Sequence, residues 1–307
     1  MNPYFAGILL AFVSPILHGW ANIIDSDFSN QIFKRLACVI FFSELVGLVF
    51  LPIVIIISPP TLIHSWLIFA MLLACALIEI FYLFPYYWAF RDADTSIVTS
   101  LFSLDKLFVP ILAYFLVGER LSTFQYLGLV LIVIASVSLN LDLKKHTINR
   151  ALYLMLGVSV MLAVESVLFK YIFNHGVCWG TAFVWVSGMQ FVVASVLLLF
   201  PKNQADFKVA RRKMNKIGYL FFLEELLSWG GEAASTAAIS LIPVSVEQGV
   251  SASQPIFVLF YALIFGRAFP KFFKEYTDKH ALIEKAAFFV VIILGTLLVI
   301  GKGVGTL

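Results

Sequence analysis

Residues 36–57 read LACVIFFSELVGLVFLPIVIII, a run in which Ser43 and Glu44 are the polar side chains. A helix needs about 20 apolar residues to cross the ~30 Å hydrocarbon core of a bilayer, so this run is long enough to span a membrane. Similar runs fill most of the 307-residue chain, which is 61% hydrophobic and 13% charged and has a mean hydropathy of +0.97. A soluble protein carries ~25% charged residues and could not bury this much apolar surface. The sequence therefore predicts an all-α polytopic membrane protein.

Polar breaks between the apolar runs divide the chain into ten predicted transmembrane helices. Their ranges are 4–24, 36–57, 65–90, 96–117, 123–140, 151–173, 179–200, 217–241, 246–266 and 284–301. The longest connections are basic, at 202–216 and 267–285, and no segment is long and polar enough for a nucleotide-binding, kinase-like or DNA-binding domain. The first run begins without a basic stretch or a cleavage site, so we expect a retained helix rather than a signal peptide.

Net charge and cysteine content point to no further class of ligand. The net charge of +3 is too small to indicate nucleic-acid binding. Cys38, Cys75 and Cys178 lie in or beside apolar runs without metal-ligand spacing, so we expect them to be packing residues. The sequence predicts no metal site, no cofactor and no catalytic residue, and it indicates nothing about the oligomeric state.

The distribution of lysine and arginine predicts the orientation in the membrane. Seventeen of the 21 such residues fall in loops after odd-numbered helices, whereas Arg120, Lys170 and Lys302 lie on the other face. Cytoplasmic loops are enriched in lysine and arginine, so both termini are expected outside, in a plasma (inner) membrane. The basic cluster at 211–213 is interpreted as part of this orientation signal rather than as a patch for lipid or a partner.

An internal repeat appears when the sequence is aligned with itself at an offset of 149 residues. Ser96 then falls on Ser245, and the polar turns that separate the apolar runs also coincide. An odd number of helices per repeat gives the two copies opposite orientations, as in many secondary transporters. The sequence therefore predicts two inverted five-helix repeats, 1–145 and 146–307, with a substrate site between them near the midplane.

Three motifs carry a family resemblance. The segment SLDKLFVP at 103–110, followed by VGERLS at 117–122 and by Gln125 and Gly128, resembles the fourth and fifth helices of EamA-type members of the drug/metabolite transporter superfamily. HGWAN at 18–22 is similar to the first helix of that family. The resemblance implies ten helices in two inverted repeats, a central cavity lined by helices 1, 3, 4, 6, 8 and 9, and alternating-access transport of a small organic solute.

Two features depart from the family pattern. Lys106 stands where family members usually have proline, so the Asp105–Lys106 pair implies a cavity with its own charge chemistry. Termini in this family are commonly cytoplasmic, whereas the lysine and arginine count predicts the opposite, and we keep the orientation that the count predicts.

Ionisable side chains inside the apolar runs are the main functional signal. Each costs ~2.5 kcal/mol or more in hydrocarbon, so it normally faces protein or a wet cavity. Carboxyl groups dominate, at Glu44, Glu79, Asp105, Glu165, Glu224, Glu225, Glu232 and Glu247, and Lys106 is the deeply placed base. Such carboxyl groups are suited to carry protons or to bind cations. The alternative role is an interhelical network that holds the bundle together, at about 0.6 kcal/mol for each contact.

Two helices are expected to present polar stripes to the cavity. The fourth carries Ser96, Thr99, Ser103, Lys106 and Pro110 at spacings of three and four. Lys106 needs a counterion from another helix, and Glu79, Glu165 and Glu232 are candidates among which the sequence does not choose. On the ninth helix Glu247, Ser251 and Gln254 lie on one side, and on the eighth Glu225, Trp229 and Glu232 share a face.

The candidate site residues fall into two groups. Residues expected to bind substrate are Trp20, Tyr82, Tyr86, Ser103, Asp105, Lys106, Trp229, Glu232, Glu247, Ser251 and Gln254. Residues expected to couple transport to protons are His18, Glu79, Glu165 and Glu225. Aromatic rings beside carboxylates suit an organic cation or a zwitterion such as an amino acid, through cation–π contact.

The sequence predicts a secondary active transporter of a small organic metabolite, coupled to protons and working by alternating access. Its expected partners are the small-molecule substrate, the lipid bilayer and protons, with no nucleic acid. One alternative is a membrane-embedded sensor or assembly subunit, which would bind a ligand without flux. Another is a membrane enzyme, for which we find neither a HExxH nor a Gly-x-Ser-x-Gly motif.

Overall fold

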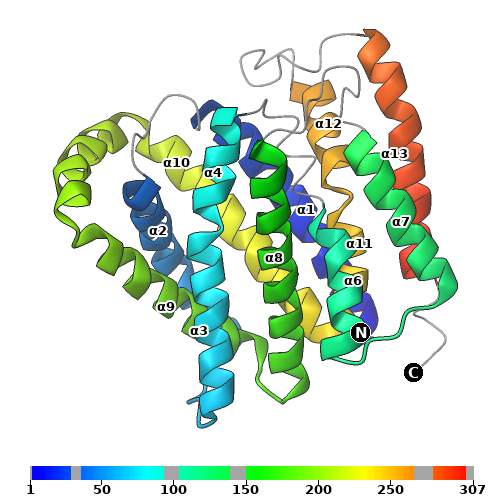
Figure 1. Ribbon diagram of the computed structural model, residues 1–307, viewed down its shortest axis with the longest axis horizontal. Helices are drawn as coiled ribbons and strands as arrows, with labels where there is room; N and C mark the ends of the chain where they lie inside the picture. Colours follow the sequence, from blue (N-terminus) through cyan, green and yellow to red (C-terminus); the bar gives the residue numbers. More distant parts are fainter. Residues whose placement is uncertain (1, 29–35, 93–103, 139–149, 266–278, 302–307) are drawn as a thin grey trace.

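The computed structural model describes residues 2–28, 36–92, 104–138, 150–265 and 279–301. Every element of secondary structure in these ranges is an α-helix (Figure 1). The helices are α1 (Pro3–Phe28), α2 (Leu36–Ile57), α3 (Trp66–Phe81), α4 (Leu83–Asp92), α6 (Asp105–Leu116), α7 (Thr123–Ser138), α8 (Arg150–Asn174), α9 (Trp179–Leu198), α10 (Pro201–Leu241), α11 (Val244–Ser251), α12 (Gln254–Phe265) and α13 (Lys279–Ile300).

Five segments of the described chain are long and apolar enough to cross a membrane. They are Pro3–Ala21, Leu36–Ile57, Trp66–Tyr86, Tyr153–Asn174 and Trp179–Leu198, and shorter apolar helices occur at Thr123–Ala135 and Val290–Ile300. Large apolar side chains are exposed on these helices, among them Ile56, Trp66 and Leu297. Exposed apolar surface of this extent suits contact with lipid. The protein is therefore an all-helical membrane protein.

The helices pack side by side in pairs that are distant in the sequence (Figure 1). The most extensive contact joins α1 to α10, followed by α7 with α13, α2 with α9 and α6 with α8. The start of α1 and the end of α13 lie at the same end of the bundle (Figure 1). The described chain therefore crosses the bundle repeatedly, and its first and last helices begin and end on the same side.

The prediction of a loop at 202–216 was wrong, because the helix α10 runs without a break from Pro201 to Leu241. Pro201 occupies the first turn, where the fixed φ of proline favours helix initiation. No glycine or proline lies between 202 and 217, and the basic residues there are good helix formers. Arg211 and Arg212 are exposed. Hydropathy detects where a helix leaves the bilayer, but it does not detect that the helix continues into water.

Two predicted helices are interrupted instead of continuous. The run at 65–90 divides into α3 and α4 at Tyr82, although the Tyr82 N–H still donates to Ile78 O (2.9 Å). The run at 246–266 divides into α11 and α12 around Ala252 and Ser253. Pro255 has no N–H to continue the α-helical ladder, which explains the second break. Of the run at 96–117, residues 96–103 lie outside the described residues, and the helix α6 begins at Asp105.

The cysteines divide by burial. Cys38 and Cys75 are buried, as expected for packing residues, whereas Cys178 is exposed. Cys178 is the N-cap residue of α9, where its sulfur contacts Thr181 Oγ1 at 2.8 Å. The expectation of a packing role for Cys178 was wrong because the residue lies at the end of a helix, outside the bundle interior.

The pair α7 and α13 approaches closely through two glycines. A Cβ atom on Gly128 would lie 2.6 Å from the carbonyl oxygen of Gly295, and one on Gly295 would lie 2.8 Å from Gly128 O. Because backbone atoms occupy these positions, a side chain there forces the helices apart.

Gly128→Ala is therefore expected to destabilise the protein by about 1–3 kcal/mol, the usual cost of overpacking. Gly157→Ala in α8 is the matched control, because a Cβ at Gly157 meets nothing within 4 Å. That control should be neutral or stabilising, since alanine is the better helix former. Thermal unfolding in detergent tests the pair, and equal midpoints for the two variants would contradict the close-packing argument.

Candidate functional site

Glu247 lies at the centre of the candidate site, on the short helix α11. Its side chain is 0% exposed, and Oε1 accepts hydrogen bonds of 2.7 Å from Ser235 on α10 and from Ser251 one turn further on. Within the described chain, Oε2 has no hydrogen-bond partner. A buried carboxylate oxygen without a partner is costly unless a proton or a cationic ligand engages it. An incoming proton or cationic ligand would satisfy this oxygen of Glu247.

Lys106 pairs with its neighbour Asp105 at the start of α6. Lys106 Nζ lies 2.7 Å from Asp105 Oδ2, and the Lys106 backbone N–H donates to Asp105 Oδ1 (2.8 Å). We expected the counterion of Lys106 on another helix, at Glu79, Glu165 or Glu232. In the structure the adjacent residue, Asp105, is the counterion instead. The lysine still lies close enough to Glu247 to interact electrostatically. A lysine and two carboxyl groups from α6 and α11 therefore form one charge cluster.

His18 on α1 borders this cluster. Its Nδ1 lies 3.2 Å from Ser14 Oγ, and its ring interacts electrostatically with Lys106. A Cβ on Gly231 would lie 2.8 Å from the imidazole, so a glycine at this position lets α10 approach the ring. The contact between α1 and α10 thus places the histidine against α10 at Gly231.

Glu79 on α3 and Glu165 on α8 share a hydrogen bond between their carboxyl groups. Two carboxylates in contact repel each other, so the pair favours holding one proton between its members. Glu165 is 4% exposed, and its Oε1 has no hydrogen-bond partner among the described residues. Glu232 on α10 interacts electrostatically with both members. It also interacts with Glu247, so the proton-sharing pair and the charge cluster are adjacent.

The carboxyl groups continue toward α2. Ser43 Oγ donates to Glu225 Oε2 (2.5 Å), and Glu44 lies near Glu225 and Glu79. Glu44 is buried, and its Oε2 has no partner in the described part of the chain. The interacting carboxyl groups therefore form a row across the bundle, which consists of Glu225, Glu44, Glu79, Glu165, Glu232 and Glu247.

The predicted aromatic residues lie in different places. Tyr82 interacts electrostatically with Glu79, Glu165 and Glu232, and the ring of Tyr86 lies 6.3 Å from that of Tyr82. These two tyrosines therefore belong with the carboxyl groups.

The two predicted tryptophans pack elsewhere. Trp20 stacks on Tyr261 of α12, with ring centroids 4.6 Å apart. Trp229 is buried against Gly47 of α2 and Phe183 of α9. Of the remaining candidates, Gln254 is half-buried at the start of α12, and Ser103 lies outside the described residues. The structure does not bring the tryptophans to the charge cluster.

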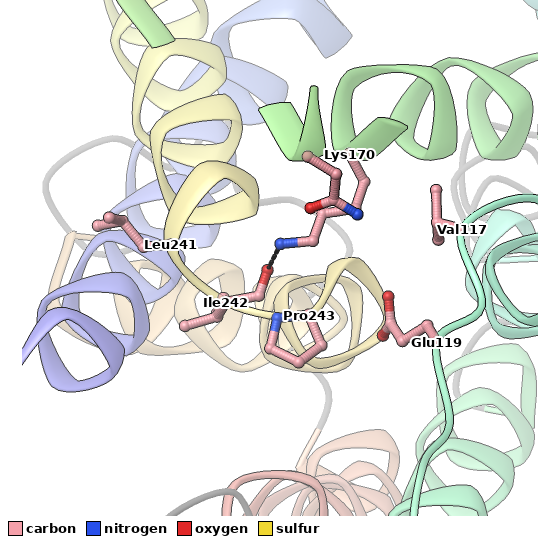
Figure 2. Close-up of a pocket in the computed structure, with 7 residues that line it drawn as sticks. Val117, Glu119, Lys170, Leu241, Ile242 and Pro243 are labelled. Atoms are coloured by element: carbon pink, nitrogen blue, oxygen red, sulfur yellow. Dashed lines mark hydrogen bonds between the residues drawn. The ribbon is translucent and has the colours of Figure 1, made fainter. Parts of the chain in front are cut away.

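A second charged site was not predicted from the sequence and lies at the turn between α10 and α11 (Figure 2). It borders an open pocket of about 200 Å³, which is lined by Val117, Glu119, Lys170, Asn174, Leu241, Ile242 and Pro243. The sequence offered weak signals, because Glu119 appeared only within the family-like VGERLS segment and Lys170 only as a rare base on its face.

At this turn Glu119 binds the N-terminal end of α11, and Lys170 binds the C-terminal end of α10. The carboxylate of Glu119 accepts hydrogen bonds of 3.1 Å from the backbone N–H groups of Val244 and Ser245, at the start of α11. Lys170 Nζ donates to Ile239 O (2.9 Å) and Ile242 O (2.7 Å), at the end of α10. Burial raises the pKa of Glu119, and the hydrogen bonds from Ser245 and the charge of Lys170 oppose that rise.

Comparison with known proteins points to one family. Residues 5–141 match the model of the EamA-like transporter family. One solved structure, described only as a crystal structure of a protein, aligns with a TM-score of 0.64 at 14% identity, over 95% of this chain and 97% of its own. At that identity the likeness shows the fold alone. A search of curated proteins finds no match to this sequence.

Proposed function

We propose that this chain, whose residues 5–141 belong to the EamA-like transporter family, is a secondary active transporter of a small organic cation or zwitterion. The family makes it a membrane transporter of the drug/metabolite type, with a small-molecule substrate and the lipid bilayer as partners. The observation that carries the finer proposal is the buried Glu247 carboxylate beside the Asp105–Lys106 pair, because one of its oxygens has no hydrogen-bond partner among the residues that the structure describes. An ammonium group is a ligand that would satisfy this oxygen.

A zwitterion suits the cluster as well as a simple cation does. An amino group would bind Glu247, and a substrate carboxylate would bind Lys106 in competition with Asp105. The hydroxyl groups of Ser235 and Ser251 orient the Glu247 carboxylate from two helices. Tyr82 and Tyr86 supply aromatic surface on the side of Glu79 and Glu165. Trp20 and Trp229 would contact the substrate only in a conformation in which their present packing changes.

The proposed architecture is ten spans in two inverted repeats, residues 1–145 and 146–307. The helix contacts support it, because exchanging the two halves reproduces the larger contacts between them. The contact of α1 with α10 corresponds to that of α8 with α3 and α4, and the contact of α6 with α8 corresponds to that of α1 with α11 and α12. The contact of α3 with α9 corresponds to that of α2 with α10. Three further contacts, α2 with α9, α6 with α11 and α7 with α13, each join a helix to its own counterpart in the other half. Rocking of one half against the other would give alternating access to the cluster.

The proposed location is the plasma (inner) membrane, with both termini outside. The lysine and arginine count supports this orientation. In the described chain, Arg211 and Arg212 are exposed on the helical extension of α10, on the face proposed to be cytoplasmic.

The proposal is tested by a ligand panel followed by flux. Purified protein is heated with amino acids, organic cations, nucleosides, organic acids and sugar phosphates at pH 5.5 and 7.5. A solute at 100 times its Kd stabilises the folded state by about 2.7 kcal/mol. Hits are then tested for uptake into proteoliposomes. Binding without flux would favour the sensor or assembly subunit, and chemical turnover without flux would favour the enzyme.

Proton coupling is proposed to use the Glu79–Glu165 pair, because two buried carboxyl groups in contact favour holding a proton between them. Glu165→Gln keeps the size of the side chain but cannot release a proton. Uptake by this variant should no longer respond when the pH gradient is collapsed, whereas uptake by the unmodified protein should fall at least several-fold. Glu224→Gln is the control, since Glu224 is a buried carboxyl group on the same bundle that accepts a hydrogen bond from Ser228 Oγ (3.0 Å), one turn further along α10. Unchanged gradient dependence in Glu165→Gln would remove this pair from the coupling mechanism.

A further inference from the structure

Glu119 joins the two halves of the chain at one face of the bundle. We call this the Glu119 face, defined by the turns at residues 117–122, 175–178 and 242–243. Gly118 has a φ of +70°, in the left-handed region that favours glycine, and it reverses the chain after α6. The Val117 and Glu119 N–H groups both donate to Ala113 O, each at 3.1 Å. This tight helix end directs the Glu119 side chain across to α11 in the second half.

The two charges match the helix ends that they meet. The N-terminus of a helix carries unpaired N–H groups and partial positive charge, and Glu119 binds both of the first two N–H groups of α11. The C-terminus carries unpaired carbonyl groups and partial negative charge, and Lys170 binds two carbonyls at the end of α10. The carboxylate and the ammonium group also interact with each other electrostatically. Figure 2 shows both side chains directed at the Ile242–Pro243 turn.

The helices held at this turn are the ones that carry the central site. Glu247 lies on α11, within one turn of Val244, and Ser235 lies on α10. The helix α11 is only eight residues long and is separated from α12 by the break at Ala252 and Ser253. A short helix fixed at one end and interrupted at the other can move as a unit once the fixed end is released.

We infer that Glu119 and Lys170 are gating residues, which close the Glu119 face and must release the α10–α11 turn before the central charge cluster opens to that side. The inference rests on the proposed transport function. It adds two residues that act on access to the substrate site, one from each half of the chain. Their open pocket places both charges within reach of solvent, so the hydrogen bonds can be exchanged for water when the turn moves.

Cys75 is a native reporter for this opening. It is 0% exposed and lies one turn before Glu79 on α3, near Glu165 and Glu232. The chain has three cysteines, so Cys38→Ser and Cys178→Ser leave Cys75 as the single thiol. The rate of Cys75 modification by a membrane-impermeant trimethylammonium methanethiosulfonate is measured from each side, in intact cells and in inverted vesicles.

In this background Glu119→Ala should raise the Cys75 rate at least tenfold from the Glu119 face and leave the rate from the opposite face unchanged. Glu119→Gln should give a smaller increase, because its amide oxygen can accept one of the two hydrogen bonds without the charge. Lys170→Met should also raise the rate, since it keeps the apolar stem but loses both donors. Arg120→Gln is the matched control, because Arg120 is the exposed neighbour of Glu119 on the same turn.

Equal rates in Glu119→Ala, Glu119→Gln and Arg120→Gln would overturn the inference. An equal increase from both faces would also overturn it, because it would indicate general loosening of the bundle rather than the opening of one gate. The labelling requires no solute. If labelling increases from one face in a protein that transports nothing, the gate is retained and the proposed transport function is rejected. If transport is normal and labelling is unchanged, the transport function is retained and the gate is rejected.

Discussion

Replacing Lys106 with methionine is expected to abolish solute uptake and to lower the free energy of unfolding by about 3–5 kcal/mol, the usual cost of breaking a buried ion pair by removing one partner. Lys106 Nζ lies 2.7 Å from Asp105 Oδ2, and the two side chains are only 12% and 7% exposed. Without the ammonium group, Asp105 and the nearby Glu247 carboxylate are left without their common counterion. Thermal unfolding in detergent and uptake into proteoliposomes measure the two effects.

The double variant Asp105→Asn with Lys106→Met is the control for this prediction. It removes both charges, so it should recover most of the lost stability without recovering uptake. If the single and the double variant unfold at the same temperature, the Asp105–Lys106 pair does not stabilise the fold and the structural part of the argument fails. If Lys106→Met transports normally, Lys106 has no role in the substrate site.

Glu247→Gln is expected to remove the thermal stabilisation produced by a cationic or zwitterionic ligand. At 100 times Kd this stabilisation amounts to about 2.7 kcal/mol in the unmodified protein. The reason is that an amide lacks the negative charge and offers one oxygen, which Ser235 and Ser251 already occupy in the structure. The ligand-free variant should be at least as stable as the original, because a buried charge has been removed.

Ser251→Ala is the graded comparison. It keeps the Glu247 carboxylate and removes one hydroxyl donor, so binding should weaken by about 0.5–1.5 kcal/mol, or roughly two- to twelvefold, and should not disappear. A full ligand-induced shift in Glu247→Gln would show that the solute binds elsewhere. A shift lost equally in both variants would mean that the geometry of the carboxylate, rather than its charge, controls binding.

Hydropathy located the apolar runs well, but it did not locate the breaks within them. The third and ninth runs are interrupted at Tyr82 and near Ser253, although neither point is polar enough to end an apolar run. The opposite error occurred at 202–216, where a basic segment continues α10. Polarity and helix continuity are separate properties, because a helix persists in water when its residues favour it and breaks in lipid when a proline removes a donor.

The site residues were predictable as a set but not as pairs. Carboxyl groups at Glu79, Glu165, Glu232 and Glu247 stand out in any apolar run, because their cost in hydrocarbon is high. The rotation of each helix about its axis decides which of these groups meet. In the structure Glu79 contacts Glu165, and Lys106 pairs with its neighbour Asp105.

The sequence by itself determined the class of this protein, its long apolar helices and the inventory of buried charges, because these follow from the composition and length of local segments. Only the tertiary structure decided which charges meet, that Trp229 packs between α2 and α9, and that Glu119 and Lys170 hold the α10–α11 turn. The hydrogen bonds at that turn join residues from 69 to 126 positions apart. They depend on how the helices cross and rotate, which no local pattern of hydropathy specifies.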